Sequence, residues 1–294
     1  MMKFAGIGEL LWDMDVKSGT RHLGGAPGNV AVHCHSHGAE SHVISKLGND
    51  PLGNEAEENI REHGVNTEFL QKTDDFPTGV VEIKVGERGI PEYEIKENAA
   101  WDHISYSPEI NAFAGDLDAV CFGSLAQRHE HSRASIQSFL KATPPSCLKV
   151  FDINLRLNYY TEETILQSLE LANALKINDE ELPIVASISG LRGSDEDVLR
   201  SLFEMYSLRL GILTYGPKGA FLMDENDSNF SPAGFAPHIE STVGAGDSYT
   251  ATTIMDFLNG KSLSEINKHA NDVASYVCTK KSATPSLPDE LKCR

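Results

Sequence analysis

The sequence predicts an α/β fold in which helices cover both faces of a mostly parallel sheet. Short apolar runs with strand character alternate along the chain with segments of helical periodicity, as in successive βαβ units. The chain has 294 residues, enough for one large α/β domain or two smaller ones. Apolar residues make up 40% of the sequence and charged residues 23%, so a substantial core can form.

Five apolar runs are expected to form the strands of this sheet. Each run is short, and a helix-like segment follows most of them, so neighbouring strands are expected to pair in parallel. The runs are 4–10 (FAGIGEL), 42–48 (HVISKLG), 117–124 (LDAVCFGS), 148–154 (LKVFDIN) and 209–216 (RLGILTYG).

Five segments between these runs are expected to be helices. Ile136, Phe139 and Leu140 recur at helical spacing in one of them, and Val198 and Leu202 do so in another. The segments are 29–38, 53–64, 134–142, 161–173 and 195–207.

Two segments, 11–24 and 78–104, interrupt this alternation. Both show strand-like alternation and turn glycines without an intervening helix. Within the second, VVEIKV and YEIK flank a connection that contains glycine, which indicates an antiparallel hairpin. The two segments therefore predict a small β appendage, used either as a lid over a cleft or as a dimer contact.

The composition excludes several classes of partner. The formal net charge is -18 and the pI about 5.0, so the surface repels nucleic-acid backbones and anionic membranes. The N-terminal apolar patch is too short for a signal peptide, and no run approaches membrane-spanning length. Five scattered cysteines without a CxxC pair favour reduced thiols and a cytoplasmic location.

Some common motifs fail on inspection. GIGELL (6–11) begins like a dinucleotide fingerprint, but Leu11 stands where a small residue is needed. The sequence has no GxxxxGK[ST] phosphate loop and neither HRD nor DFG of protein kinases. In HCHSHG, His33 and His37 would share a helix face, but without a third ligand they are better interpreted as packed or polar histidines than as a metal site.

The stretch 243–248, VGAGDS, precedes an apolar-periodic run. Its glycines allow close backbone approach, and the amides of a helix N-terminus attract a phosphate or a developing oxyanion. Asp247 is then either a base that takes a proton from an attacking hydroxyl or simply a residue that caps the helix. The motif alone leaves both readings open.

Four other motifs follow apolar runs. GGAPGNVA (24–31) places three glycines ahead of a helix, with Asn29 at its start, and DINLR (152–156) ends a predicted strand in polar residues. KINDEEL (176–182) spaces Asn178 and Glu181 three apart, which suits a hydrated Mg²⁺ beside phosphates. TYGPKG (214–219) is a further strand-to-glycine turn.

In the order GELLWD, GGAPGNVA, KLGNDPLG, DINLR, KINDEE, TYGPKG and VGAGDS, these motifs resemble the PfkB/ribokinase family of carbohydrate kinases, and within it the fructokinases. The match runs from Gly6 to Pro288, and GGAPGNVA and GAGD are its most specific parts. The resemblance implies a ribokinase-like three-layer α/β/α fold formed by one domain, residues 1–294. The excursions 11–24 and 78–104 would be its β lid, through which relatives often dimerise.

The resemblance also implies roles at the reacting centre. Asp247 matches the base that deprotonates the sugar hydroxyl. The amides of Gly244, Ala245 and Gly246 match the anion hole around the transferring γ-phosphoryl group. Positions near the sugar are matched by Asp13, Gly25, Asn29 and Arg156.

On the nucleotide side, Asn178 and Glu181 match the family's NxxE element, which organises Mg²⁺ through water. The loop and the adenine contact are matched by Thr214, Gly216, Gly219 and Asn271. Two departures stand out. Ser241 replaces an acid that in some relatives helps to hold a monovalent cation, which puts K⁺ activation in doubt, and Lys281 replaces a usual glycine.

The resemblance therefore predicts an ATP- and Mg²⁺-dependent sugar kinase, most similar to fructokinases, that acts as a homodimer. GGAPGNVA and the stretch 100–102 (AWD) favour fructose over ribose or adenosine. One alternative is a sugar-acid kinase for 2-keto-3-deoxygluconate, with Arg128 or Arg156 on the substrate carboxylate. The other is a non-catalytic sugar- or nucleotide-binding regulator, against which the intact GAGD and NxxE elements argue.

Overall fold

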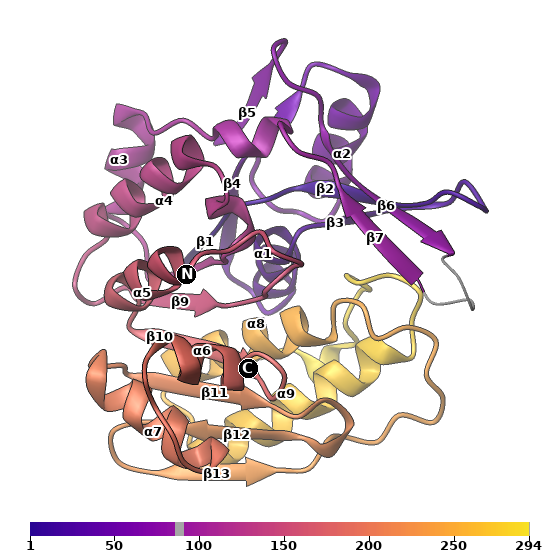
Figure 1. Cartoon of the computed structure of the whole chain (residues 1–294). Helices are drawn as coiled ribbons and strands as arrows, with labels where there is room; N and C mark the ends of the chain where they lie inside the picture. Colours follow the sequence, from indigo (N-terminus) through magenta and orange to yellow (C-terminus); the bar gives the residue numbers. More distant parts are fainter. Residues whose placement is uncertain (86–90, 294) are drawn as a thin grey trace.

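A nine-stranded sheet forms the centre of the molecule in the computed structural model, which describes residues 1–85 and 91–293 (Figure 1). The strand order is β13-β12-β11-β10-β9-β8-β1-β4-β5. All neighbours from β11 to β5 pair in parallel, and β12 and β13 add an antiparallel edge. The strands are β1 (Lys3–Ile7), β4 (Glu40–Gly48), β5 (Leu70–Thr73), β8 (Ala119–Phe122), β9 (Leu148–Asp152), β10 (Ala174–Asn178), β11 (Leu210–Thr214), β12 (Ala220–Met223) and β13 (Ser228–Ser231).

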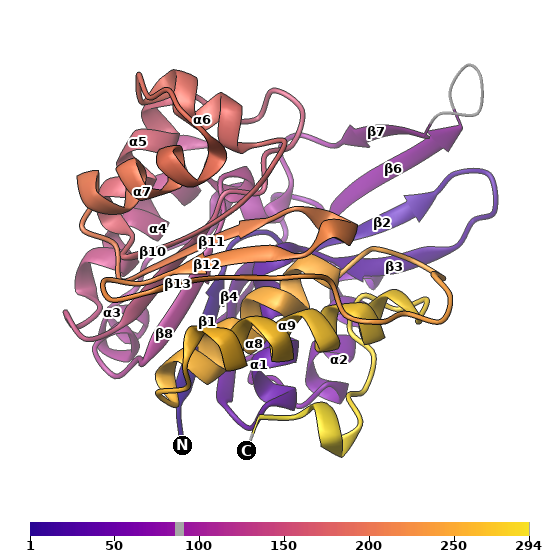
Figure 2. The same cartoon turned by 90° about the horizontal axis from the view of Figure 1, so that it is seen from below.

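Helices cover both faces of this sheet, which gives the predicted three layers (Figure 2). On one face lie α1 (Ala26–Ser36), α2 (Pro51–Glu62), α8 (Ala245–Leu258) and α9 (Leu263–Cys278). On the other lie α3 (Pro108–Ala114), α4 (Glu130–Ala142), α5 (Glu162–Leu171), α6 (Leu182–Ile188) and α7 (Asp195–Met205). Among the described residues, no helix combines the length and the apolar character that crossing a bilayer requires.

Alternating side chains of the strands divide the core into two. In β1, Phe4 packs with the cluster that contains Val30 of α1, whereas Ile7 packs with the cluster that contains Phe139 of α4. Each face buries its own helices through the two-residue period of the strands. The near-continuous apolar runs of the sequence are therefore explained by burial on both sides.

The strands and helices expected from the sequence are present, with ends that differ by a few residues. The first helix begins earlier than expected, at Ala26 instead of residue 29, because Pro27 suits the first turn of a helix. The strand pair β12 and β13 is not predicted. The polar residues 224–227 join these strands, and β13 has no buried residue, so the sequence carries little strand signal there.

The two irregular excursions form a separate four-stranded sheet in the order β3-β2-β6-β7. It contains β2 (Leu11–Asp15), β3 (Arg21–Gly24), β6 (Gly79–Val85) and β7 (Pro91–Ile95). The predicted hairpin is confirmed, since β6 and β7 pair antiparallel with Val81 opposite Ile95. The expected connection, residues 86–90, lies outside the described residues. Figures 1 and 2 show this small sheet projecting from one side of the body.

The end of the second excursion belongs to the body rather than to the small sheet. Ala100–His103 form a short 3₁₀ helix, η2, and the side chain of Trp101 is completely buried in the core beside α4. The small sheet is thereby anchored at its base, where η2 follows β7. Further 3₁₀ turns in the described part of the chain are η3 (Leu125–Gln127), η4 (Gly216–Lys218) and η5 (Asp289–Leu291).

Candidate active site

Two helices that pack against each other, α1 and α8, both begin after a glycine. Gly25 and Gly244 have φ angles of +117° and +81°, which glycine adopts without strain. A Cβ at Gly25 would lie 2.3 Å from the carbonyl oxygen of Glu9, and one at Gly244 would lie 2.2 Å from that of Ala283. Any larger residue at either position would therefore collide with the backbone.

These two helix starts also lack a side-chain cap among the described residues, whereas Asp50 caps α2 by accepting a hydrogen bond from Gly53. In α8, the amide of Ala245 donates to the carbonyl of Thr242 at 3.3 Å. The amides of Gly244 and Gly246 have no backbone partner within the described part of the chain. An anion can therefore bind at this helix start.

Asp247 lies in the first turn of α8 and is half-buried. Its Oδ2 accepts a hydrogen bond from Nδ2 of Asn29 on α1, at 2.7 Å. Because Gly244 is the capping residue, the capping interpretation of Asp247 is not favoured. Burial and the carboxylate of Asp152 raise the pKa of Asp247 to about 6, against the opposing effects of Asn29, Lys176 and Arg156.

The candidate sugar residues come from three elements. Asp13 on β2 lies beside Gly24, where an added Cβ would stand 2.6 Å from Asp13 Oδ2. Burial raises the pKa of Asp13, while the positive charge of Arg156 opposes this rise. Arg156 is exposed, and its charge acts on Asp13 and on Asp247. The structure therefore brings Asp13, Gly25, Asn29, Arg156 and Asp247 into one region.

The NxxE residues form a closed turn after β10. Oδ1 of Asn178 accepts hydrogen bonds from the amides of Glu180 and Glu181, at 2.9 and 2.8 Å. In return, the buried Glu181 carboxylate accepts from the amides of Asn178 and Leu155, at 3.1 and 2.9 Å. Each carboxylate oxygen keeps acceptor capacity after one such bond. The pair therefore fits the binding of a hydrated Mg²⁺ through water, its oxygen chemistry being the kind Mg²⁺ prefers.

The expected nucleotide loop lies beside this turn. Thr214 at the end of β11 pairs with Asn178 in register. Gly216 and Gly219 have φ angles of +56° and +114°, and a Cβ at Gly219 would lie 2.1 Å from the carbonyl oxygen of Ser231. Glycine is therefore needed to return the chain into β12 at this point.

Asn271 is buried on α9 and lies in a polar network. Its Nδ2 donates to Oδ1 of Asn267 at 2.9 Å, and Asn267 in turn donates to the carbonyl of Ala220 at 3.0 Å. These bonds tie α9 to β12. A surface cavity of about 340 Å³ opens beside this network, lined mainly by Phe230, Ser231, Pro232, Gly234, Lys268 and Asp272.

Three buried charged residues near Asp247 were not among the predicted site residues. Lys176 and Asp152 face each other in register on β10 and β9, and Lys176 Nζ donates to Asp152 Oδ1 at 3.0 Å. Glu9 follows β1 and is 2% exposed. A lysine within the apolar strand ALKIN was the available signal for Lys176, but its partner could not be read from the sequence.

Arg128, considered above for a substrate carboxylate, is already paired. Its Nε and Nη2 donate to both oxygens of Asp102 at 2.7 Å, and Nη2 also donates to the carbonyl of Lys96. Its guanidinium stacks on Trp101, 4.1 Å from the ring centre, and on Tyr159. Arg128 therefore holds the base of the small sheet.

The histidines of HCHSHG are packed and hydrogen-bonded. His33 Nε2 bonds the carbonyl of Ala283 at 3.0 Å. His37 Nε2 bonds the hydroxyl of Thr252, and its Nδ1 accepts from the amide of Cys293, both at 3.0 Å. Burial lowers the pKa of His33 to about 4 and that of His37 to about 3, so both rings are neutral.

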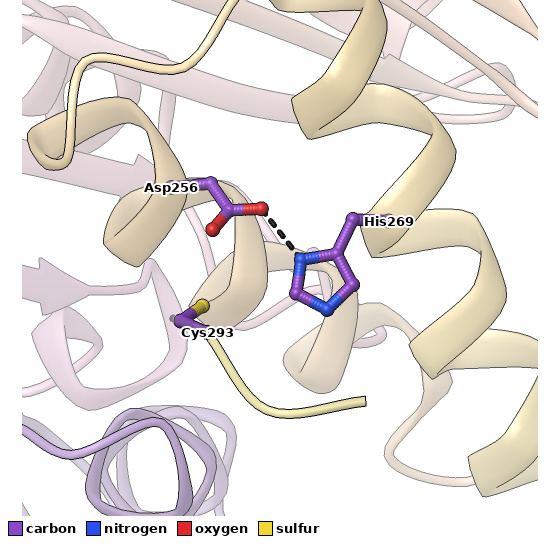
Figure 3. Close-up of side chains that lie close together, drawn as sticks. All are labelled: Asp256, His269 and Cys293. Carbon is purple, nitrogen blue, oxygen red and sulfur yellow. Dashed lines mark hydrogen bonds and ion pairs between the residues drawn. The ribbon is translucent and has the colours of Figure 1, made fainter. Parts of the chain in front are cut away.

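Asp256, His269 and Cys293 form a separate cluster with metal-ligand chemistry (Figure 3). Asp256 Oδ2 lies 2.6 Å from His269 Nδ1, and Lys261 Nζ lies 2.7 Å from the other carboxylate oxygen. His269 Nε2 faces the carbonyl of Leu291 at 3.1 Å. The Asp256 carboxylate already faces the nitrogen atoms of His269 and Lys261. The cluster is therefore best explained as a set of contacts that hold residues 291–293 against α8 and α9.

Known proteins resemble this chain over nearly its whole length. The profile of the pfkB family carbohydrate kinases matches residues 12–290. A sugar kinase of Pyrococcus horikoshii is 30% identical over 98% of this chain and 94% of its own length. The fructokinase of Vibrio alginolyticus is 26% identical over 97% of this chain and 95% of its own.

A solved structure gives the same result. The crystal structure of the uncharacterized sugar kinase from Pyrococcus horikoshii in complex with ATP superposes with a TM-score of 0.82 and 28% identity. The alignment covers 97% of this chain and 95% of that one. The expected ribokinase-like fold is therefore confirmed. The chain belongs to the pfkB family of carbohydrate kinases and is a phosphotransferase that acts on a sugar hydroxyl.

Proposed function

We propose that this kinase transfers the γ-phosphoryl group of ATP to fructose, with Asp247 as the general base. The observation that carries the proposal is the Asn29–Asp247 hydrogen bond of 2.7 Å between two helix starts that lack side-chain caps. The proposal is supported by this arrangement because the Asp247 carboxylate lies beside amides suited to an anion. A base and an anion site in contact are what phosphoryl transfer to an alcohol needs.

In the proposed reaction, Asp247 takes the proton of the sugar hydroxyl while that oxygen attacks the γ-phosphorus. The bond between the γ-phosphorus and the bridging oxygen breaks, and ADP leaves. Asp13, Asn29 and the backbone at Gly25 hold the sugar hydroxyls, and Arg156 adds positive charge beside the sugar and phosphates.

The remaining predicted residues serve the nucleotide. The transferring phosphoryl group is received by the amides of Gly244 and Gly246 and by that of Ala245, in place of the 3.3 Å bond from Ala245 to Thr242. Asn178 and Glu181 would hold Mg²⁺ through water, and the ion would supply positive charge to the phosphates of ATP. The loop of Thr214, Gly216 and Gly219 and the region of Asn271 are proposed to contact the rest of the nucleotide.

Fructose is proposed over a sugar acid for two reasons. Several relatives named fructokinase are 25–27% identical to this chain over 90% of its length or more. In addition, Arg128 is hydrogen-bonded to Asp102, so Arg156 is the remaining candidate cation for binding a substrate carboxylate. A second candidate, phosphorylation of 2-keto-3-deoxygluconate, rests on Arg156.

The test is a panel of sugars and sugar acids with Mg·ATP, followed by ADP formation. Fructose is expected to give the highest kcat/KM, and Asp247→Asn to lower kcat by about 10²-fold or more. Asp116→Asn, which removes the same charge at an exposed surface position, serves as the matched control. A preference for the sugar acid would replace the substrate assignment, and an active Asp247→Asn enzyme would remove the base.

The cellular setting is also a proposal. We expect a cytoplasmic homodimer that associates through the small sheet. The exposed side chains of Val16 and Tyr93, which lie at or next to this sheet, support that contact.

A further inference from the structure

The strongest unexplained feature behind the site is a buried lysine. The side chain of Lys176 is 9% exposed and that of Asp152 is 3% exposed. Lys176 Nζ donates to Asp152 Oδ1 at 3.0 Å, and Thr250 donates to the other oxygen at 3.3 Å. Burying such a pair costs desolvation energy that two well-packed apolar residues would avoid. The pair therefore needs an explanation beyond stability.

The position of the ammonium suggests one. Lys176 Nζ lies 3.6 Å from the point where a Cβ of Gly246 would stand. Gly246 is in the first turn of α8, immediately before Asp247, and its amide belongs to the proposed anion hole. The ammonium therefore lies close to the Gly246 backbone, in the helix turn that would receive the phosphoryl group.

The charges around the ammonium do not balance. The carboxylates of Asp152, Glu181 and Asp247 all act on Lys176. The ammonium donates a hydrogen bond to the Asp152 carboxylate at 3.0 Å, a contact that favours the charged form of Lys176. One ammonium facing three acids leaves excess negative charge where an anionic phosphoryl group must arrive.

Other groups also face Asp247. Arg156 lowers its pKa from the loop after β9, and Glu9, at the end of β1, is coupled to it. The thiol of Cys121 on β8 is buried next to the same acids, and burial raises its pKa well above the ordinary value, so it stays neutral. Arg156 is exposed and Lys176 is buried, so Lys176 acts through a less polarisable medium.

We propose that Lys176 is a positioning residue of phosphoryl transfer, whose buried ammonium supplies positive charge beside the first turn of α8 without touching either substrate. It favours the ionised form of Asp247 and the anion at the helix start at the same time. This inference rests on the proposed role of Asp247 but not on the identity of the sugar.

Three variants test the inference, assayed with whichever sugar the panel identifies. Lys176→Met removes the charge and keeps the length of the side chain. It is expected to lower the plateau kcat by about 10-fold or more while KM for the sugar changes by less than about threefold. The acid limb of the kcat–pH profile is expected to move to higher pH, by about one unit.

Asp152→Asn is the first comparison, because Asp152 raises the pKa of Asp247 and its loss should move the acid limb to lower pH. Opposite movements in the two single variants are expected from charge and not from a packing defect. The double variant Asp152→Asn/Lys176→Met removes both members of the buried pair, so Asp152 is not left without its cation, and it serves if Lys176→Met fails to fold. The double variant is expected to fold. The acid limb of its kcat–pH profile should lie near that of the parent enzyme, and its plateau kcat should remain below the parent value.

Two results would overturn the inference. A double variant with the parent plateau kcat would show that Lys176 only neutralises Asp152. An acid limb that does not move in a folded Lys176→Met enzyme would show that the ammonium does not act on the base. Asp247→Asn, assayed in parallel, separates these failures from a failure of the base assignment itself.

Discussion

Two buried ion pairs in this kinase each join a basic side chain to an aspartate, but they differ in the charges that surround them. Arg128 and Asp102, at the base of the small sheet, are 7% and 2% exposed, and Lys176 and Asp152, behind α8, are 9% and 3% exposed. The guanidinium of Arg128 binds both oxygens of Asp102 at 2.7 Å. Lys176 holds one oxygen of Asp152 at 3.0 Å.

The difference lies in the charge around each pair. One cation meets one carboxylate in the first pair, and two aromatic rings cover the cation. In the second pair, Glu181 and Asp247 add their negative charge. A balanced pair gains nothing from an arriving ion, so it can serve the fold alone. The excess negative charge around the second pair opposes an arriving phosphoryl anion, so loss of its ammonium is expected to affect the reaction and not the fold alone.

The largest expected effect comes from breaking the balanced pair. Arg128→Met leaves the Asp102 carboxylate buried without its cation, which typically costs about 3–5 kcal/mol of unfolding free energy. Urea unfolding followed by circular dichroism measures this loss. The kcat of the folded variant is expected to stay within about threefold of the parent value.

The control for this variant is Arg61→Met, which removes the same side chain from an exposed position on α2. Arg128 Nη1 has no hydrogen-bond partner among the described residues. If Arg128→Met lost activity while keeping its stability, that nitrogen would be assigned to the substrate, and the pair would no longer be purely structural.

Glu9 differs from both ion pairs because it is a buried acid without a hydrogen-bonded cation among the described residues. Its Oε2 has no hydrogen-bond partner within the described residues, and burial raises its pKa to about 7 from an ordinary value of 4.5. The folded state thus binds the proton more tightly than the unfolded state. The resulting stability is complete below pH 4.5 and is lost as the pH rises through 7.

Glu9→Gln removes this pH dependence. At pH 8 the variant is expected to be more stable than the parent by about 1–3 kcal/mol, whereas at pH 4.5 the two should be nearly equal. Thermal unfolding at both pH values measures the difference. An equal difference at pH 4.5 and pH 8 would show that Glu9 does not titrate in the folded protein.

Much of the site could be predicted because its residues lie in local motifs. Asn29 and Asp247 are 218 residues apart, but each stands at a glycine-initiated helix start that the sequence displays. Lys176 could not be predicted in the same way, because its significance depends on its register with Asp152 across two parallel strands. Arg128 was misjudged as an available cation for a similar reason. Its partner, Asp102, lies in a segment that was assigned to the lid, whereas η2 packs in the body.

The smallest expected effect concerns an exposed pair near α8. Lys281 Nζ lies 3.7 Å from Glu240 Oε1, with 83% and 41% of the two side chains exposed. This pair links the loop before α8 to the segment that contains Ala283, whose carbonyl oxygen lies where a Cβ of Gly244 would collide with it. Such an exposed pair contributes little, because water and salt screen it. Ser241, in the same loop, accepts a hydrogen bond from Val243 and offers no carboxylate for a cation.

Lys281→Gln is therefore expected to change kcat by less than about twofold. Replacing K⁺ by Na⁺ in the assay buffer is expected to have an equally small effect on kcat. Ser241 stands at the position where some relatives have an acid that helps to hold a monovalent cation. Initial rates of the parent and the variant in both buffers measure these two effects. A large dependence on K⁺ in the parent enzyme would show that backbone carbonyls alone can hold the cation. A K⁺ dependence of the rate that appears only in Lys281→Gln would show that the lysine ammonium substitutes for that ion. The exposed Lys281–Glu240 pair would then contribute to catalysis.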